Sequence, residues 1–317
     1  MSGLPDVQNE MPRIPLSLDE VGITGLIKRV RIAKGKSEVF LTPKISAFIN
    51  LPRKQRGVHL SRSSEAIESI VDDVTYSPVE SVEELCRKIL MRLLEKHEYA
   101  DRARVLLEGP AVFDVRASES EVKRQKAYML HVEGVATRKK EKIGVRVFLG
   151  VDVEGMTACP CAQELIRDYA ESVIRRRAEE FSLSTETIRK ILDLVPLASH
   201  SQRCKGTLIV EVKDSSIDIY ELAKVVEDSM SGVIQDVLKR PDEASLVRLA
   251  HLNPLFVEDV ARLIIMNALT RLRQLSDDAI IEVRVESIES VHPHNVVAYR
   301  RARVGELKKE FQAGCDA

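Results

Sequence analysis

The segment IGVRVFLGVDV, from Ile143 to Val153, is followed by a tight turn at Cys159-Pro160-Cys161. The pattern of the sequence changes at this turn from that of a strand to that of a helix. The apolar and β-branched residues of the segment predict a strand. The residues after the turn, CAQELIRDYAESVIRRR from Cys161 to Arg177, predict a helix. Two thiols on such a turn lie near free backbone N–H groups and the positive end of a helix dipole, which favours a thiolate. A thiolate acts as a nucleophile or as a metal ligand.

Strands and helices recur on both sides of this turn in an order that occurs twice. Before it we expect a polar, Pro-rich arm, a hairpin within 26–50, helices within 64–97, and strands at 102–107, 126–135 and 143–153. After it we expect helices within 161–194, a strand at 207–212, helices at 218–233 and 256–275, and closing strands near 283 and 296–298. This order predicts an α+β chain of two similar halves.

We therefore divide the chain into four parts. They are an N-terminal arm (1–25), a first half (26–153), a second half (154–306) with a helical insert (165–197), and a C-terminal tail (307–317).

The composition excludes several classes of protein. Of 317 residues, 44% are hydrophobic and 31% charged, and 48 basic residues face 49 acidic ones, so no general affinity for polyanions follows. Aromatic residues make up 4% and Trp is absent, which argues against a stacking platform for nucleic acid. No apolar run reaches the roughly 18–20 residues that span a membrane, and the N-terminus lacks the features of a signal peptide. Five unevenly spread cysteines do not suggest a disulfide framework, so we expect a cytoplasmic protein.

Polar side chains that carry chemistry gather in four short clusters. They are His59-Leu60-Ser61-Arg62-Ser63, Cys159-Pro160-Cys161, His200-Ser201-Gln202-Arg203, and Glu289-Ser290-Val291-His292-Pro293-His294-Asn295. Together, the thiolate, imidazole and carboxylate groups match a metal site with one position open to water. Such a site is catalytic, because a closed structural site requires four fixed Cys or His ligands at short spacing.

Each cluster taken alone also has a structural interpretation. His59 and Arg62 suit either a polar helix start or phosphate binding. The cysteines of the turn could be inert, and a lone His200 could be structural. His292 and His294 would face the same side of a strand, but Pro293 between them disfavours a strand.

Longer motifs spread over the chain resemble the GTP cyclohydrolases of the tunnelling fold (T-fold), specifically the archaeal type (type IV), with the bacterial type IB as a related type. They are Asp6-Val7-Gln8, GVHLSRS (57–63), KHEYADRARV (96–105), GMTACPCAQ (155–163), ASHSQR (198–203), LKRPDEA (238–244), NPLFVEDVAR (253–262) and ESVHPHNVVA (289–298). The long helical insert between Cys161 and His200 is similar to the archaeal type. The resemblance implies two ββααββ-like halves per subunit, and a homo-oligomer (dimer or tetramer) that forms a barrel with active sites at subunit interfaces.

The resemblance also implies roles for individual residues. Cys159, His200, Glu243, His292 and His294 match positions at the metal, and Glu289 belongs to the motif that closes the metal site. The implied metal is Fe(II), with zinc or manganese as alternatives. Glu258 matches the glutamate that anchors the purine ring, although a first-turn acid can also complement the helix dipole. His59, Arg62 and Arg203 would hold the triphosphate.

The implied reaction begins with attack of water on C8 of GTP, which opens the imidazole ring and releases formate. In the archaeal type the implied product is 7,8-dihydroneopterin 2′,3′-cyclic phosphate with diphosphate, for methanopterin-type or folate-type pterins. The type IB product would be dihydroneopterin triphosphate. Two other hypotheses are a T-fold nitrile reductase, which would consume NADPH and need no metal, and a nucleotide- or metal-binding protein without activity.

Overall fold

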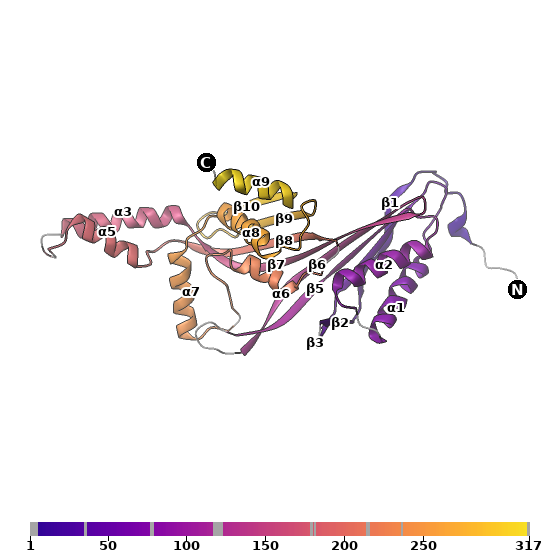
Figure 1. The fold of residues 1–317 in the computed structure, drawn as a ribbon, viewed down its shortest axis with the longest axis horizontal. Helices are drawn as coiled ribbons and strands as arrows, with labels where there is room; N and C mark the ends of the chain where they lie inside the picture. The colour runs from indigo at the N-terminus through magenta and orange to yellow at the C-terminus, as the bar shows by residue number, and fades with distance from the viewer. Residues whose placement is uncertain are drawn as a thin grey trace.

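A computed structural model describes residues 6–34, 37–76, 79–116, 123–177, 180, 182–213, 216–235 and 237–315. Its central feature is an antiparallel sheet of eight strands in the order β1-β4-β5-β6-β7-β8-β9-β10 (Figure 1). The turn expected at Gly35 lies outside the described residues, but the strands on either side of it, β2 and β3, pair as the predicted hairpin.

The same order of elements occurs twice along the chain. The first half contains β1 (Leu18–Ile27), β2 (Val30–Lys34), β3 (Ser37–Leu41), β4 (Lys44–Leu51), α1 (Leu60–Tyr76), α2 (Val82–Lys96), β5 (Arg102–Arg116) and β6 (Lys123–Lys139). The second contains β7 (Lys142–Ala158), α3 (Pro160–Arg176), α5 (Thr185–Leu194), β8 (Ser201–Val212), α6 (Ile219–Glu227), α7 (Arg240–Leu252), α8 (Val257–Arg271), β9 (Ile280–Ser287), β10 (Val296–Arg303) and α9 (Val304–Cys315). Without the hairpin β2–β3, the inserted helices α3, α5 and α7, and the C-terminal helix α9, each half is ββααββ, as expected for the T-fold.

Some boundaries differ from the sequence-based expectation. The repeated order divides the chain at the turn between β6 and β7, ahead of the boundary that we drew after Val153. The strand β1 begins at Leu18, inside the expected arm, because it pairs with β4 along its length. The expected tail is largely the helix α9, and α7 was not predicted. Residues 1–5 of the arm and 316–317 of the tail lie outside the described residues.

The helices α2, α6 and α8 pack on the sheet, and the core lies between these helices and the sheet. α2 contacts β5, β6 and β7, while α6 and α8 contact strands of the second half. Alternate residues of β7, such as Leu149 and Val151, are fully buried by these helices. Gly134 permits a close approach, because a Cβ atom there would lie 2.4 Å from the Sγ of Cys86. Cys86 and Cys204 are both buried, as packing residues should be.

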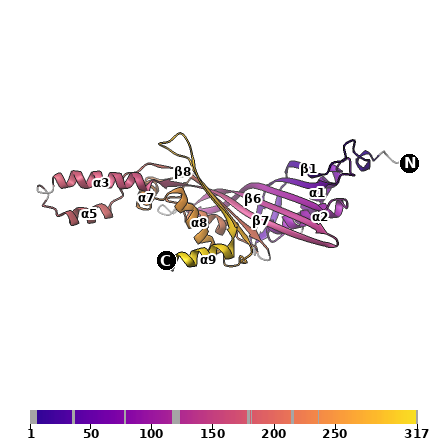
Figure 2. The ribbon, with the colours of Figure 1, turned by 90° about the horizontal axis from the view of Figure 1, so that it is seen from above.

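The helical insert stands apart from this core. α3 and α5 project beyond the end of the sheet, at the opposite end of the molecule from α1 and α2 (Figures 1 and 2). The inner side of α5 buries Ile188 and Leu192, whereas α3 has no buried residue. Among the described residues, no helix is long and apolar enough to cross a membrane.

Candidate functional site

Cys159 and His200 face each other at the end of two paired strands. Ala158, the last residue of β7, pairs with Ser201, the first residue of β8. One position further out, the backbone N–H of Cys159 donates to the carbonyl of His200 at 3.0 Å. Residues directly opposite each other in an antiparallel pair have neighbouring side chains. The thiol and the imidazole, separated by a long insert in the sequence, are therefore brought together by strand pairing.

The turn at Cys159 is held by several hydrogen bonds. The Sγ of Cys159 accepts from the N–H of Ala162 at 3.5 Å as the N-cap of α3, so the positive end of the helix dipole faces the sulfur. The hydroxyl of Ser199 donates to the carbonyl of Cys159 at 2.6 Å. Gln163 donates to the carbonyls of Leu197 and His251, which ties α3 to α7. The sulfur is thus kept half-buried in one position.

A half-buried hydrogen-bond network orients His200. Its Nδ1 lies 3.0 Å from the Oε1 of Gln202, while the Nε2 of Gln202 donates to Thr157 (3.2 Å) and Glu289 (3.4 Å). Ser287 also donates to Glu289, at 2.9 Å. Because Oε1 of an amide only accepts, the proton of a neutral His200 ring lies on Nδ1, and in that tautomer Nε2 has the lone pair. Nε2 has no hydrogen bond to a residue that the structure describes, so it can bind a metal ion or accept a proton.

Gln202 was named in one of the four polar clusters but was given no role there, and Thr157 and Ser287 were not predicted. Gln202 lies two residues after His200 and so faces the same side of the strand. Thr157 and Ser287 gave no signal, since their contact with Gln202 and Glu289 depends on the order of strands in the sheet.

The other residues expected at the metal lie further out. His292 and His294 are exposed in the connection between β9 and β10, where their rings stack at 5.3 Å. Ser290 of this connection comes within 3.5 Å of Nδ1 of His200. Glu243 is exposed in the first turn of α7. Within the described part of the chain, no group of three or more His, Cys, Asp or Glu side chains could hold a metal ion.

Glu258 lies on a different part of the second half. It is exposed in the first turn of α8, at a groove of about 550 Å³ between α8, β10 and α9. The groove is lined mainly by apolar side chains, among them Ile265, Leu269 and Phe311. A carboxylate beside an apolar wall can bind the polar edge of a flat ring.

His59 and Arg62 lie at the opposite end of the sheet from Cys159. The hydroxyl of Tyr99 interacts with the backbone of His59 and with Nδ1 of His97, at 2.9 Å from the latter. Tyr99 lies within the segment 94–100, whose carbonyls accept from Arg138, near the turn that begins β7. Since β7 has 17 residues, its two ends are about 50 Å apart at roughly 3.3 Å per residue.

The group of residues around His59 and Arg62 includes a buried, neutral histidine, His97. The side chain of His97 is fully buried, and its Nε2 lies 3.0 Å from the hydroxyl of Ser63 in α1. Burial, with the nearby charges of Arg62 and His59, lowers the pKa of His97 to about 4. Burial also raises the pKa of Tyr99. Nδ1 of His59 is buried without a hydrogen bond to a described residue, while its Nε2 lies 3.5 Å from Asp6.

Arg203 and Cys204 follow Gln202 along β8 but do not join the hydrogen-bond network around His200. Arg203 alternates with Gln202 along β8, so it faces the other side of the sheet, where it lies 3.5 Å from Glu154. Burial raises the pKa of Cys204 to about 12, and the charge of Glu289 adds to that effect. Cys204 is therefore a protonated thiol in the core and not a second nucleophile.

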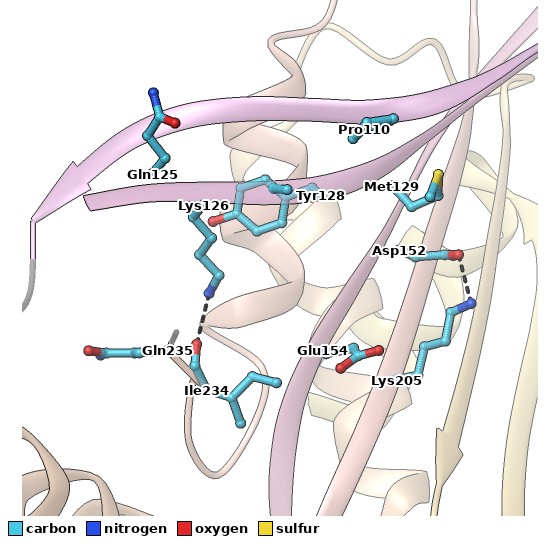
Figure 3. A pocket seen from close by; sticks show the side chains of 11 residues that line it. Pro110, Gln125, Lys126, Tyr128, Met129, Asp152, Glu154, Lys205, Ile234 and Gln235 are labelled. Atoms are coloured by element: carbon cyan, nitrogen blue, oxygen red, sulfur yellow. Dashed lines mark hydrogen bonds and ion pairs between the residues drawn. The ribbon is translucent and has the colours of Figure 1, made fainter. Parts of the chain in front are cut away.

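A separate pocket of about 400 Å³ lies where the sheet forks (Figure 3). Pairing of β6 with β7 begins only at Met129 and Asp152, so β5 and β6 diverge there from β7 and β8. Lys126 donates to the carbonyl of Ile234 at 3.3 Å, and Lys205 lies 2.8 Å from Asp152. None of the residues expected at the active site lines this pocket. Its lysines already have partners, so we assign it no ligand.

The chain is similar to GTP cyclohydrolases over nearly its whole length. Residues 4–298 match the family described as "Type I GTP cyclohydrolase folE2". The chain is 38% identical over 310 residues to GTP cyclohydrolase MptA of Methanothermobacter thermautotrophicus, covering 97% of this chain and 96% of the relative. It is 38% identical over 314 residues to GTP cyclohydrolase MptA of Methanosphaera stadtmanae, covering 98% of each.

Solved structures are similar in fold alone. A uricase from Bacillus fastidious aligns with a TM-score of 0.51 at 9% identity, covering 92% of this chain and 95% of that one. Uricase is a T-fold protein, so the α+β T-fold expected from the sequence is confirmed.

Proposed function

The chain belongs to the type I GTP cyclohydrolase family, and we propose that it opens the guanine ring of GTP at C8. The products are formate, diphosphate and 7,8-dihydroneopterin 2′,3′-cyclic phosphate, which serves methanopterin biosynthesis, as in the archaeal type. The observation that carries this proposal is the cross-strand pair of Cys159 and His200, backed by Gln202 and Glu289. A nitrile reductase would need the thiol but would leave this oriented imidazole without a task.

The sulfur of Cys159 and the imidazole of His200 are suitable ligands for a divalent metal ion. A half-buried sulfur at a helix N-terminus and an imidazole with a fixed tautomer suit Fe(II), which we propose, or zinc or manganese. Glu243, His292 and His294 are the candidates for the remaining ligands. When bound, such an ion acts as a Lewis acid and lowers the pKa of a water molecule from about 15.7 toward 7.

The protein's own residues would then orient the substrate and move protons. Glu289 and Gln202 keep the proton of His200 on Nδ1, so Nε2 stays directed at the reacting centre. We propose His292 as the group that moves protons as the bond between C8 and N9 breaks. Glu258 would accept hydrogen bonds from N1–H and the 2-amino group of guanine.

Triphosphate binding by His59 and Arg62 at a site with Cys159 requires two copies of the chain. Arg203 faces the other side of the sheet from His200 and does not fit this site. The ends of β7 are about 50 Å apart, much more than the length of one nucleotide, so His59 and Cys159 of one copy cannot share a GTP. If two copies pair about a two-fold axis, the His59 end of each can meet the Cys159 end of the other. We therefore propose a composite active site in a dimer or tetramer that builds the barrel.

The free cysteines fit a reducing compartment, and we propose the cytoplasm as the place of the reaction.

Subunit complementation tests this proposal. Cys159→Ala and Arg62→Ala should each release little formate from GTP. After subunit exchange, half of the dimers are mixed and each has one intact site out of two, so about a quarter of the wild-type activity should return. Mixing Cys159→Ala with the double variant Cys159→Ala/Arg62→Ala is the control and should restore nothing. Verified exchange without recovery would show that the site is not composite, and a wild-type protein that releases no formate with any of the three metals would refute the activity.

A further inference from the structure

We propose that the outer side of α3 in one copy docks on the N-terminal segment of a second copy. The outer stripe is Cys161, Leu165 and Tyr169, and the N-terminal segment is 11–18. The proposal rests on the composite site above and adds a contact surface to it.

The outer stripe is apolar and uncovered. Cys161, Leu165 and Tyr169 are four residues apart, so they lie on one side of the helix. Leu165 is 67% exposed and Tyr169 is 66% exposed. The opposite side of α3 packs on α5, and the pair of helices projects away from the rest of the molecule (Figures 1 and 2). A Leu and a Tyr this exposed on one helical side are typical of a protein contact.

The N-terminal segment is a second apolar surface, at the other end of the molecule. Met11, Ile14 and Leu16 are 63%, 70% and 71% exposed. The chain just before them is fixed, because the N–H of Arg56 donates to the carbonyls of Gln8 and Glu10 at 3.1 and 3.0 Å. The segment is thereby held beside the residues that lead into His59.

The two surfaces meet if the composite site forms. The outer stripe begins two residues after Cys159, and the N-terminal segment follows Asp6, which lies 3.5 Å from His59. A second copy that brings His59 within reach of the same GTP as Cys159 therefore also brings its N-terminal segment to α3. In a two-fold dimer this contact forms twice. A second copy of this chain is for that reason the occupant of the stripe.

The charges beside the two surfaces are complementary. Glu164 and Asp168 flank the stripe, whereas Arg13 lies in the N-terminal segment and Arg53 and Lys54 lie near it, and all five are exposed. Of the two acidic residues at the ends of the segment, Glu10 is paired with Arg56, which leaves Asp19 as the one acidic charge beside it without an ion pair to a residue in the described ranges. None of the five forms an ion pair with another residue of the described ranges. Opposite charges at the rim of a contact steer the two copies into register.

Cross-linking tests the contact directly. Ile14→Cys protein is treated with a short bismaleimide, and linked peptides are identified by mass spectrometry. We expect a covalent dimer in which position 14 is joined to Cys161 of the other copy. Met91→Cys, an exposed position on α2, is the matched control and should give no link to α3. A dimer in which position 14 of Ile14→Cys never links to α3 would overturn the proposal.

Charge insertion gives a second measurement. Leu165→Glu/Tyr169→Glu should raise the dimer Kd about 30-fold or more, measured by light scattering over a dilution series, and Met91→Glu should leave it unchanged. An unchanged Kd in the α3 variant would refute the docking surface, even if complementation between Cys159→Ala and Arg62→Ala succeeds. Cross-linking without complementation would instead keep the contact and reject the composite site.

Discussion

Acidification should weaken the fold through His97. This side chain is fully buried between Ser63 and Tyr99, and its pKa is lowered from 6.5 to about 4. Between these two pH values the unfolded chain binds a proton at this position and the folded chain does not. The free energy of unfolding therefore falls as the pH drops from about 6.5 toward 4.

The size of the effect follows from the two pKa values. With 6.5 in the unfolded state and about 4 in the folded state, His97 costs about 2 kcal/mol of unfolding free energy at pH 5 relative to pH 7. His131 acts in the opposite direction, because a hydrogen bond to Asp152 raises its pKa. The wild type alone therefore shows only the sum of such contributions.

The His97→Gln variant isolates the contribution of this histidine. Glutamine can still bond to one of the two hydroxyls but does not titrate. Urea unfolding at pH 7 and pH 5, at one protein concentration, should show that the variant loses about 2 kcal/mol less than the wild type. His131 is present in both proteins, so its contribution cancels. An equal loss in the two proteins would refute the buried, neutral state of His97.

Three further predictions concern the active site. Cys159→Ala should abolish bound metal while Cys161→Ala retains it, because Cys159 pairs with His200 through the backbone whereas Cys161 is exposed on α3; equal metal content in the two purified variants would reject the assignment. Gln202→Leu should lower kcat about 10- to 100-fold with little change in KM, since it frees the ring of His200, and steady-state kinetics that match the wild type would rule this out. Glu258→Ala should reduce the preference for GTP over ATP at least about 100-fold, and an unaltered ratio of kcat/KM values would remove its role at the purine.

Much of the site could be predicted from single positions. The change of apolar periodicity from strand to helix predicted a turn with both cysteines near a helix start, and the structure makes Cys159 the N-cap of α3. The ordered repeat of strands and helices predicted two similar halves, and the motifs correctly identified the GTP cyclohydrolase family. Where the prediction failed, as at β1, pairing with β4 stabilised a strand that its local sequence did not indicate.

The sequence by itself determined which chemical groups this protein has, because the residue type fixes a thiol, an imidazole or a carboxylate. Only the tertiary structure decided which of these groups meet and which stay reactive, since burial keeps the thiol of Cys204 protonated. Strand pairing puts Cys159 opposite His200 and brings Glu289 to Gln202 behind the ring, across separations that no local pattern records. The same long strands put His59 and Arg62 about 50 Å away, at the other end of β7. Strand length and order, which follow from packing of the whole sheet, therefore decide that one chain holds only part of the proposed site.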